Sequence, residues 1–145
     1  MANPNHPVTS REYKLILQAD RFKDRAEGSA IFWELVEALL LQAGGQIHER
    51  QNEEMLRRTW YLDTPDLDLR SHNLNLRVRE EMDEQKKYKV TLKYRGPDRY
   101  LSAAQDISSP EKGETKFEED VLPSFISKFS HSTSLKFRRS LKLSG

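Results

Sequence analysis

Polar and apolar side chains alternate in two neighbouring segments near the middle of the chain, a pattern typical of strands with one polar and one apolar face. The first segment is "LNLRVRE", residues 74–80, and the second is "YKVTLKYR", residues 88–95. The charged segment between them, "EMDEQKK", is typical of a hairpin loop. The pattern therefore predicts an antiparallel pair of strands with one cationic face. The cations on that face are Arg77, Arg79, Lys89, Lys93 and Arg95.

The same alternation predicts further strands on both sides of this pair. One is "REYKLIL", residues 11–17, and the others are "KFEEDV", residues 116–121, and "SLKFRRSLKLSG", residues 134–145. Residues 46–62 form a strand-rich region that we expect to be broken near "RQNEE". The polar side chains that share a face within these strands are Glu12 and Lys14, then Lys116, Glu118 and Asp120, and finally Lys136 and Arg138.

One long helix is predicted between the first strand and the strand-rich region. Residues 29–45, "SAIFWELVEALLLQAGG", carry apolar side chains at intervals of three and four residues, which is the spacing of a buried helical stripe. Ser29 is the predicted N-cap, and Gly44 with Gly45 marks the predicted end.

Two short helices are also predicted. Thr64 can cap a helix whose first residue is Pro65, because a proline needs no hydrogen-bond partner for a backbone N–H at that position. The segment "LPSFISKF", residues 122–129, reads as a second short helix. Residues 96–115 are predicted to be a polar connection.

Composition narrows the possible functions. The chain has 145 residues, enough for one domain with a hydrophobic core, and its 24 lysines and arginines nearly balance 23 acids. Bulk charge thus gives no reason to expect a membrane or a specific nucleic acid as partner. With no cysteine, a thiolate metal site is excluded. The start, "MANPNHPVTS", lacks the apolar core of a signal peptide, so we expect a cytoplasmic protein with a flexible arm over residues 1–9 and one domain over residues 10–145.

Two interpretations of the charged strand faces follow. In the first, each charged face is the solvated side of an ordinary antiparallel sheet, and the protein is a scaffold without a ligand. In the second, the faces point into a barrel that holds a polar ligand. Cations crowded in such a lumen would repel one another and would need a polyanion such as a phosphate chain. Glu12, Glu118 and Asp120 would supply the hard oxygen ligands that suit Mg²⁺ or Mn²⁺.

The sequence resembles the CYTH domains, also called triphosphate tunnel metalloenzymes. The similar stretches are "REYKLIL", "TWYLDTPDLDL", "LNLRVRE", "VTLKYRG" and "KFEEDV", which follow one another in the family's order from about residue 10 to residue 121. The resemblance implies an α+β fold: an eight-stranded antiparallel β-barrel with helices packed outside. It also implies action on a triphosphate compound with a divalent metal. Members include inorganic and thiamine triphosphatases, class IV adenylate cyclases and polynucleotide triphosphatases.

The sequence departs from the family pattern in three respects. Ser10 stands where the motif of the opening strand has its first glutamate. In the strand over residues 116–121 the first acidic position is Glu118, but the second is Asp120, which has a shorter side chain. The family's final strands, which carry further acidic ligands, are not found before Gly145. We therefore expect a fragment, a tunnel that is open on one side, or a tunnel completed by another chain, for which a homodimer is one arrangement.

The resemblance implies metal-dependent hydrolysis of inorganic triphosphate, thiamine triphosphate or a nucleoside triphosphate. Glu12 and Lys14 are the expected catalytic residues, Lys14 either contacting the substrate or activating water. Glu12, Glu118 and Asp120 are the expected ligands of Mg²⁺ or Mn²⁺. The expected substrate-binding residues are Arg77, Arg79, Lys89, Lys93, Arg95, Lys116, Lys136 and Arg138. The alternatives are a non-catalytic module that binds polyphosphate or nucleotide with a degraded metal site, and an activity like that of class IV adenylate cyclases.

Overall fold

The computed structural model describes residues 7–48, 56–82 and 87–138. Its chain divides into two compact units. Residues 1–14 and 55–145 form the first unit, which contains all the described strands, and residues 15–54 form the second, which contains the long helix.

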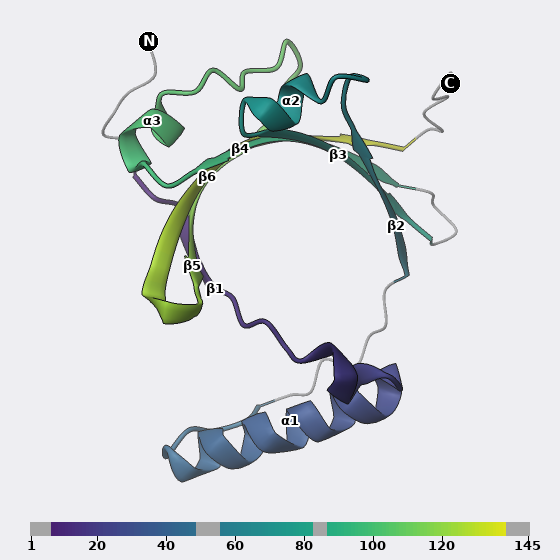
Figure 1. The fold of residues 1–145 in the computed structure, drawn as a ribbon, viewed down its shortest axis with the longest axis vertical. Helices are drawn as coiled ribbons and strands as arrows, with labels where there is room; N and C mark the ends of the chain where they lie inside the picture. The colour runs from purple at the N-terminus through teal and green to yellow at the C-terminus, as the bar shows by residue number, and fades with distance from the viewer. Residues whose placement is uncertain (1–6, 49–55, 83–86, 139–145) are drawn as a thin grey trace. The chain divides into compact units, whose positions relative to one another are not determined.

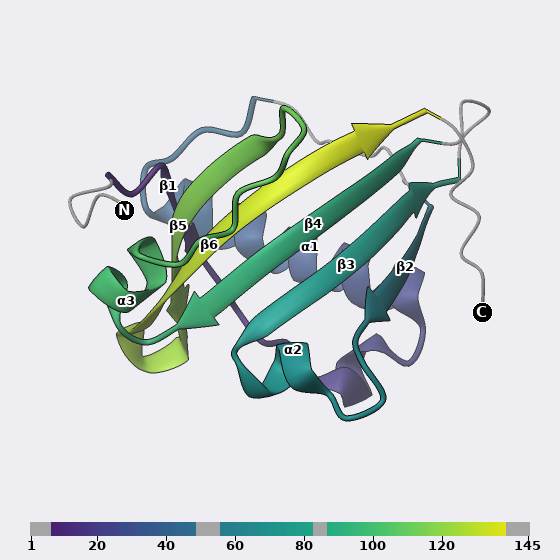
Figure 2. The same cartoon turned by 90° about the horizontal axis from the view of Figure 1, so that it is seen from above.

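The first unit is built on a six-stranded sheet in the order β1-β5-β6-β4-β3-β2. Neighbouring strands are antiparallel except β1 and β5, which are parallel. Figure 2 shows the strands side by side, and Figure 1 shows that the sheet is strongly curved. The strands are β1 (Ser10–Tyr13), β2 (Arg57–Leu62), β3 (Leu74–Glu81), β4 (Tyr88–Gly96), β5 (Glu114–Leu122) and β6 (Ile126–Phe137).

The sheet confirms the predicted fold class in an open form. Its strands are mostly antiparallel and curve as the wall of a barrel does, as expected for an α+β barrel of this kind. Among the described residues, however, β1 and β2 are edge strands and do not pair with each other. The sheet is therefore an incomplete barrel of six strands, where the resemblance implied eight.

The strand register places the predicted cations on one face of the sheet. Residues that are directly opposite on neighbouring strands point to the same side. Arg79 of β3 is opposite Lys89 of β4, and Arg77 is opposite Thr91. Val78 is opposite Val90, so the apolar side chains share the other face. The period-two pattern of the sequence is thus confirmed for β3 and β4.

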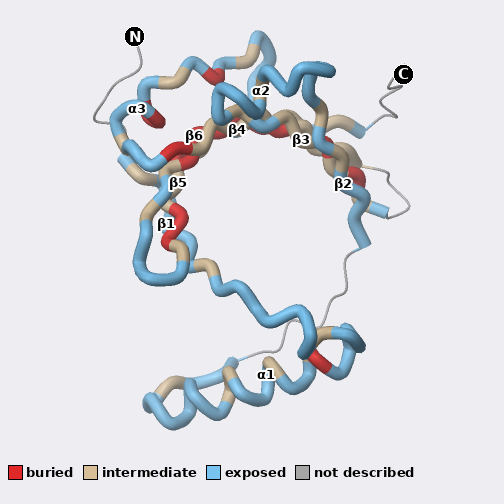
Figure 3. The backbone as a smooth tube through the Cα atoms, viewed as in Figure 1, coloured by how far each residue is buried: buried red, intermediate tan, exposed pale blue. Residues whose placement is uncertain are grey.

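The apolar face carries the core and lies on the convex side of the sheet. Figure 1 shows α2 (Asp68–Ser71) and α3 (Arg99–Ala103) on that side. Phe117 is fully buried there, with its ring stacked 6.2 Å from that of Phe129. Figure 3 shows the buried residues concentrated along the middle of the sheet. Because the cationic face is opposite to this core, it forms the concave side. The buried apolar residues of the core are Val78, Ala103, Ile107, Phe117 and Val121.

The predicted helix over residues 122–129 is wrong. A short turn, η2 (Pro123–Phe125), is followed directly by the strand β6. Ser124 and Phe125 have positive φ values of 67° and 57°, a left-handed conformation that reverses the chain instead of starting an α-helix. The spacing of Leu122, Phe125 and Phe129 imitates a helix, but pairing of β6 with both β4 and β5 outweighs this local preference.

Other predicted strands are shorter than expected. The strand over residues 11–17 is confirmed only as β1, which starts at Ser10 and ends at Tyr13. In the region 46–62 the strand β2 begins at Arg57, and residues 49–55 lie outside the described part of the chain. The strand predicted over residues 134–145 corresponds to the last part of β6, which ends at Phe137. Residues 83–86 of the hairpin and residues 139–145 also lie outside the described part. The polar connection over residues 96–115 contains α3.

The second unit consists of a short 3-10 helix, η1 (Ala19–Phe22), and the long helix α1 (Arg25–Gln42). The predicted cap at Ser29 is wrong, because the carboxylate of Asp24 accepts a hydrogen bond from the backbone N–H of Glu27 at 2.9 Å and caps the helix there. Gly28 allows η1 to lie against α1, since a Cβ at this position would approach the Arg21 carbonyl oxygen to 2.6 Å.

The predicted end of α1 is confirmed, but its buried stripe is not. Gly44 adopts a positive φ of 78°, which terminates the helix as the glycine pair predicted. Leu35 and Leu39 of the stripe are 57% and 55% exposed, because among the described elements of this unit only η1 packs on α1. None of the helices in the described ranges has the length and apolarity needed to cross a membrane.

The predicted cap of the short helix α2 is confirmed, because Thr64 Oγ1 accepts a hydrogen bond from the backbone N–H of Asp68 at 3.0 Å, but the predicted start at Pro65 is wrong. The helix begins at Asp68, three residues after Pro65, because Leu67 takes a left-handed φ of 57°. Asp63 is the main cap, since its carboxylate accepts hydrogen bonds from the backbone N–H groups of Thr64, Leu69 and Arg70 at 2.8–3.0 Å. Burial acts to raise the pKa of Asp63, but these three hydrogen bonds outweigh it and lower the pKa.

We predict that Asp63 makes stability depend on pH in the acid range. Since the pKa of Asp63 is lower in the folded than in the unfolded protein, its contribution is present above the unfolded value of about 3.9 and is lost as pH falls through the folded pKa. Asp63→Ala should lower the melting temperature at pH 7 and narrow its gap to the wild type near pH 3. Asp66→Ala, in the same turn, is the control and should match the wild type at both pH values. A gap that stays constant between pH 7 and pH 3 would contradict the assigned role of Asp63.

Candidate functional site

The concave face brings together predicted site residues from β1, β3, β4, β5 and β6. Ser132 of β6 illustrates the arrangement, because it is opposite Lys93 of β4 on one side and Lys116 of β5 on the other. Lys136 is opposite Lys89 and is exposed, and Arg138 directly follows β6. One polar face therefore carries cations from several strands, as the alternation predicted.

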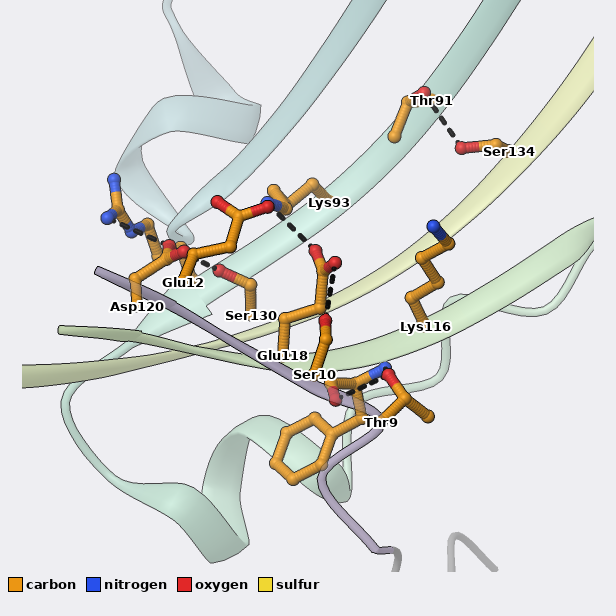
Figure 4. Close-up of polar contacts among 12 residues, drawn as sticks. Thr9, Ser10, Glu12, Thr91, Lys93, Lys116, Glu118, Asp120, Ser130 and Ser134 are labelled. Carbon is orange, nitrogen blue, oxygen red and sulfur yellow. Dashed lines mark hydrogen bonds and ion pairs between the residues drawn. The ribbon is translucent and has the colours of Figure 1, made fainter. Parts of the chain in front are cut away.

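Three predicted carboxylates gather where β1 pairs with β5. The parallel register places Glu12 opposite Asp120 and Ser10 opposite Glu118. Glu118 and Asp120 are two residues apart on β5 and so share its concave face. Figure 4 shows the carboxyl groups of Glu12, Glu118 and Asp120 projecting from these two strands. The β1–β5 edge is thus the acidic end of the site.

Asp120 lies at the centre of this acidic end and is fully buried. Its Oδ2 accepts a hydrogen bond from Ser130 Oγ at 3.1 Å and lies 2.9 Å from a terminal nitrogen of Arg95. Its Oδ1 lies 2.9 Å from Lys14 Nζ. Both cations approach within ion-pair distance, but neither contact has hydrogen-bond geometry. Burial acts to raise the pKa of Asp120, while Lys14 and Arg95 outweigh it and lower that pKa, so the group stays ionised.

Glu118 is held by a hydroxyl and a lysine. Ser10 Oγ donates a hydrogen bond to Glu118 Oε1 at 3.0 Å, and Lys93 Nζ lies 3.7 Å from Oε2 (Figure 4). Ser10, which replaces the first glutamate of the resembling motif, therefore orients a neighbouring carboxylate. It does not add a negative charge.

Lys14 bridges two of the carboxylates. Its Nζ lies 3.2 Å from Glu12 Oε2 and 2.9 Å from Asp120 Oδ1. Burial acts to lower the pKa of Lys14, but the close contacts of its ammonium with the Asp120 and Glu12 carboxylates outweigh burial and raise the pKa. Lys14 is therefore protonated at neutral pH and has no lone pair with which to take a proton from water. This state favours a role as a cation over a role as a base.

Arg77 and Arg79 form the opposite, cationic end of the site. Within the described ranges neither guanidinium has an ion pair or a hydrogen bond to a side chain. Burial lowers the pKa of Arg79, and the positive charges of Arg77 and Arg57 lower it further. The concave face is thus polarised, with carboxylates at the β1–β5 edge and uncompensated arginines on β3.

The middle of the face holds a shared carboxylate. Lys89 Nζ and Lys116 Nζ lie 3.7 Å and 3.4 Å from the two oxygens of Glu114. These three side chains are partly exposed, so their ion pairs are weak and open readily. Lys89 and Lys116 can therefore turn to an incoming anion.

The donor set suits a hard divalent ion, although the carboxylates are now paired with cations. Glu12, Glu118 and Asp120 offer only oxygen, the ligand that Mg²⁺ and Mn²⁺ prefer. In the part of the chain that the structure describes, no three acidic or histidine side chains form a ready metal cluster. Asp120 Oδ1 is nevertheless buried without a hydrogen bond, so it retains lone pairs for a further ligand. These residues can hold a metal ion once the ion pairs of the carboxylates with Lys14, Lys93 and Arg95 rearrange.

Several residues of the site were missed from the sequence. Ser130 Oγ donates a hydrogen bond to Asp120 Oδ2, and Ser134 Oγ and Thr91 Oγ1 are hydrogen-bonded at 2.9 Å. These serines alternate with Lys136, and so the pattern was present in the sequence. It was overlooked because the prediction divides β6 into a helix over residues 122–129 and a strand from Ser134, so that Ser130 belongs to neither.

A comparison with protein families now identifies the chain. The model of the CYTH domain matches residues 34–143, well over half of the 145 residues, while β1 with Glu12 and Lys14 lies before the match. No curated protein and no solved structure gives a significant match. The family acts on triphosphate compounds with divalent metals, and both the curved antiparallel sheet and its polarised concave face agree with this. The chain therefore belongs to the CYTH domain family.

Proposed function

We propose that this protein hydrolyses a triphosphate compound on the concave face of its sheet with the help of Mg²⁺ or Mn²⁺. The observation that supports this most strongly is the polarity of the face. Arg77 and Arg79, which have no acidic partner among the described residues, need an anion, whereas the carboxylates at the β1–β5 edge can hold a divalent cation. A metal-bound phosphate chain satisfies both ends at once.

The residues have separate tasks in this proposal. Arg77 and Arg79 bind phosphate oxygens through paired N–H donors, and Lys93 and Lys116 hold the chain as point charges on either side of Ser132. Lys89, Arg95, Lys136 and Arg138 extend the positive surface. Glu12, Glu118 and Asp120 would hold the divalent ion, which stabilises charge on the phosphate oxygens when bound. Most of the catalytic effect thus comes from positioning and charge.

Hydrolysis transfers a phosphoryl group to water. A P–O bond forms to the attacking water, the P–O bond to the leaving phosphate breaks, and the water loses a proton to the solvent or to a carboxylate. Protonated Lys14 cannot accept that proton, so we assign it to charge stabilisation. Glu12 is half exposed and is the most accessible of the three proposed metal ligands.

A second candidate is a non-catalytic module that binds polyphosphate or nucleotide. The pairing of Asp120, Glu118 and Glu12 with lysine or arginine favours it, because a protein without a metal would keep its carboxylates neutralised in this way. A transfer like that of class IV adenylate cyclases would use the same clamp, with a ribose hydroxyl in place of water.

Turnover separates these candidates. We expect phosphate release from tripolyphosphate, thiamine triphosphate or ATP in the presence of Mg²⁺ or Mn²⁺, and none after chelation with EDTA. Chromatography of the ATP reaction would show a cyclic product if the cyclase alternative were correct. Thermal melting is the parallel measurement, since tripolyphosphate at about 100 times its dissociation constant should stabilise the fold by about 2.7 kcal/mol. Stabilisation without turnover of any of these compounds would support the non-catalytic module.

Charge reversal at the two ends should have opposite effects. Glu118→Lys should abolish metal-dependent hydrolysis but preserve or improve anion binding, because it removes a metal ligand and adds a cation. Arg79→Glu should weaken anion binding even without metal. Calorimetric titration with tripolyphosphate measures both effects, with circular dichroism to confirm the fold. Equal loss of binding in the two variants would mean that Glu118 is wrongly assigned to the metal.

The uncompensated cations should also destabilise the free protein. Arg79→Gln should raise the unfolding free energy by about 0.2–1 kcal/mol, the usual range for facing side chains on paired strands, and should make it less sensitive to salt. Arg58→Gln is the matched control on the opposite face, where Arg58 pairs with Glu80 at 3.6 Å and lies over the Trp60 ring. This control should destabilise the protein slightly. Chemical denaturation at two salt concentrations tests both variants, and a loss of stability in Arg79→Gln would contradict the repulsion.

A further inference from the structure

Lys14 is anchored by its backbone and exposed at its side chain. The strand β1 ends at Tyr13, and the backbone N–H of Lys14 still donates to the Val121 carbonyl at 2.9 Å. The side chain is 36% exposed and ends between two carboxylates, with Nζ 3.2 Å from Glu12 Oε2 and 2.9 Å from Asp120 Oδ1. The ammonium can therefore leave the two carboxylates by rotating its four-carbon stem, with no change in the strand.

We propose that the ammonium group of Lys14 holds the place of the divalent ion between Glu12 and Asp120, and that binding of the ion displaces it. The inference rests on the proposed function, because it concerns the same carboxylates. It makes Lys14 an internal competitor of the metal, a role that neither substrate contact nor water activation includes.

The charges around Asp120 support an exchange at this point. Glu12 and Asp120 carry two negative charges, and Lys14 and Arg95 balance them. A divalent ion added to this balanced group would create excess positive charge, so release of one cation favours its entry. Lys14 is the cation that can leave, because Arg95 lies beside the other oxygen of Asp120, where Ser130 also binds.

The geometry of Asp120 Oδ1 supports the same exchange. This oxygen is buried, yet its contact with Lys14 lacks hydrogen-bond geometry. A buried carboxylate oxygen without a directed hydrogen bond is incompletely satisfied, and a metal ion would complete its coordination. The displaced ammonium then has neither carboxylate as partner, and a phosphate group can compensate its charge. Metal and phosphate should therefore favour each other's binding.

A purely structural role for Lys14 predicts something different. If the two ion pairs served only to attach β1 to β5, removal of the ammonium would lower stability and would leave metal affinity unchanged or reduced. Competition predicts that the same removal tightens metal binding in the absence of any phosphate.

The test is a titration with Mn²⁺ alone, followed by the electron paramagnetic resonance signal of the free ion. Lys14→Met should bind Mn²⁺ about tenfold more tightly than the wild type. In the wild type Lys14 occupies the site in most molecules, and the apparent affinity for Mn²⁺ is reduced in proportion to the fraction of molecules in which the site is free. Lys112→Met is the control. It removes an exposed lysine that has no proposed role in metal or phosphate binding, and it should bind Mn²⁺ as the wild type does. Lys14→Arg keeps the charge and should not gain affinity.

A second measurement follows the ammonium directly. In ¹⁵N-labelled protein the Lys14 Nζ resonance, identified by its absence in Lys14→Met, should shift when Mg²⁺ and tripolyphosphate are added together. Unchanged or weaker Mn²⁺ binding in Lys14→Met, no Mn²⁺ binding in any variant, or a Lys14 resonance that does not move would each overturn the inference. Lys14→Gln replaces Lys14→Met if the latter does not fold. Failure of the proposed function is recognised separately, by absence of phosphate release in the wild type.

Discussion

The site depends on one buried carboxylate, that of Asp120. A carboxylate removed from water is stable in its ionised form only if nearby cations and donors replace the lost hydration. Here Lys14 follows β1, Arg95 comes from β4 and Ser130 comes from β6, so three separate parts of the sheet are drawn to one side chain of β5. The same contacts that make Asp120 tolerable in the interior bring cations and acids of the site within reach of each other.

This arrangement explains why the concave face is polarised instead of uniformly cationic. The acids collect at the β1–β5 edge, where the register makes Glu12 a neighbour of Asp120, while Arg77 and Arg79 stand on β3 without acidic partners in the described ranges. The repulsion among the arginines is unfavourable for the free fold, and such local instability is common where a protein keeps a surface for a ligand. In this protein the strain is electrostatic, and the proposed polyanion would remove it.

Much of the fold could be predicted because alternation is a strong signal on long strands. For β3, β4 and β5 the period of two identified which side chains share a face, and the structure confirms it. The failures share one cause. Local spacing over residues 122–129 suited a helix, and the apolar run after Tyr13 suited a longer strand, but neither signal contains information about distant partners. Ser130 was therefore missed as a donor to Asp120, although its alternation with Lys136 was visible.

The sequence by itself determined the chemistry that is available: oxygen ligands, cations that can clamp phosphate, and alternation that puts each set on one strand face. It also carried the resemblance to the CYTH domains that the family match confirms. Only the tertiary structure decided which charges meet. The parallel pairing of β1 with β5 placed Lys14 between Glu12 and Asp120, and the pairing of β6 with β4 and β5 placed Ser132 between two lysines. Such contacts depend on the register between separate segments of the chain, which are more than 100 residues apart in the case of β1 and β5. No local pattern can encode that register, because each strand face is compatible with many partners.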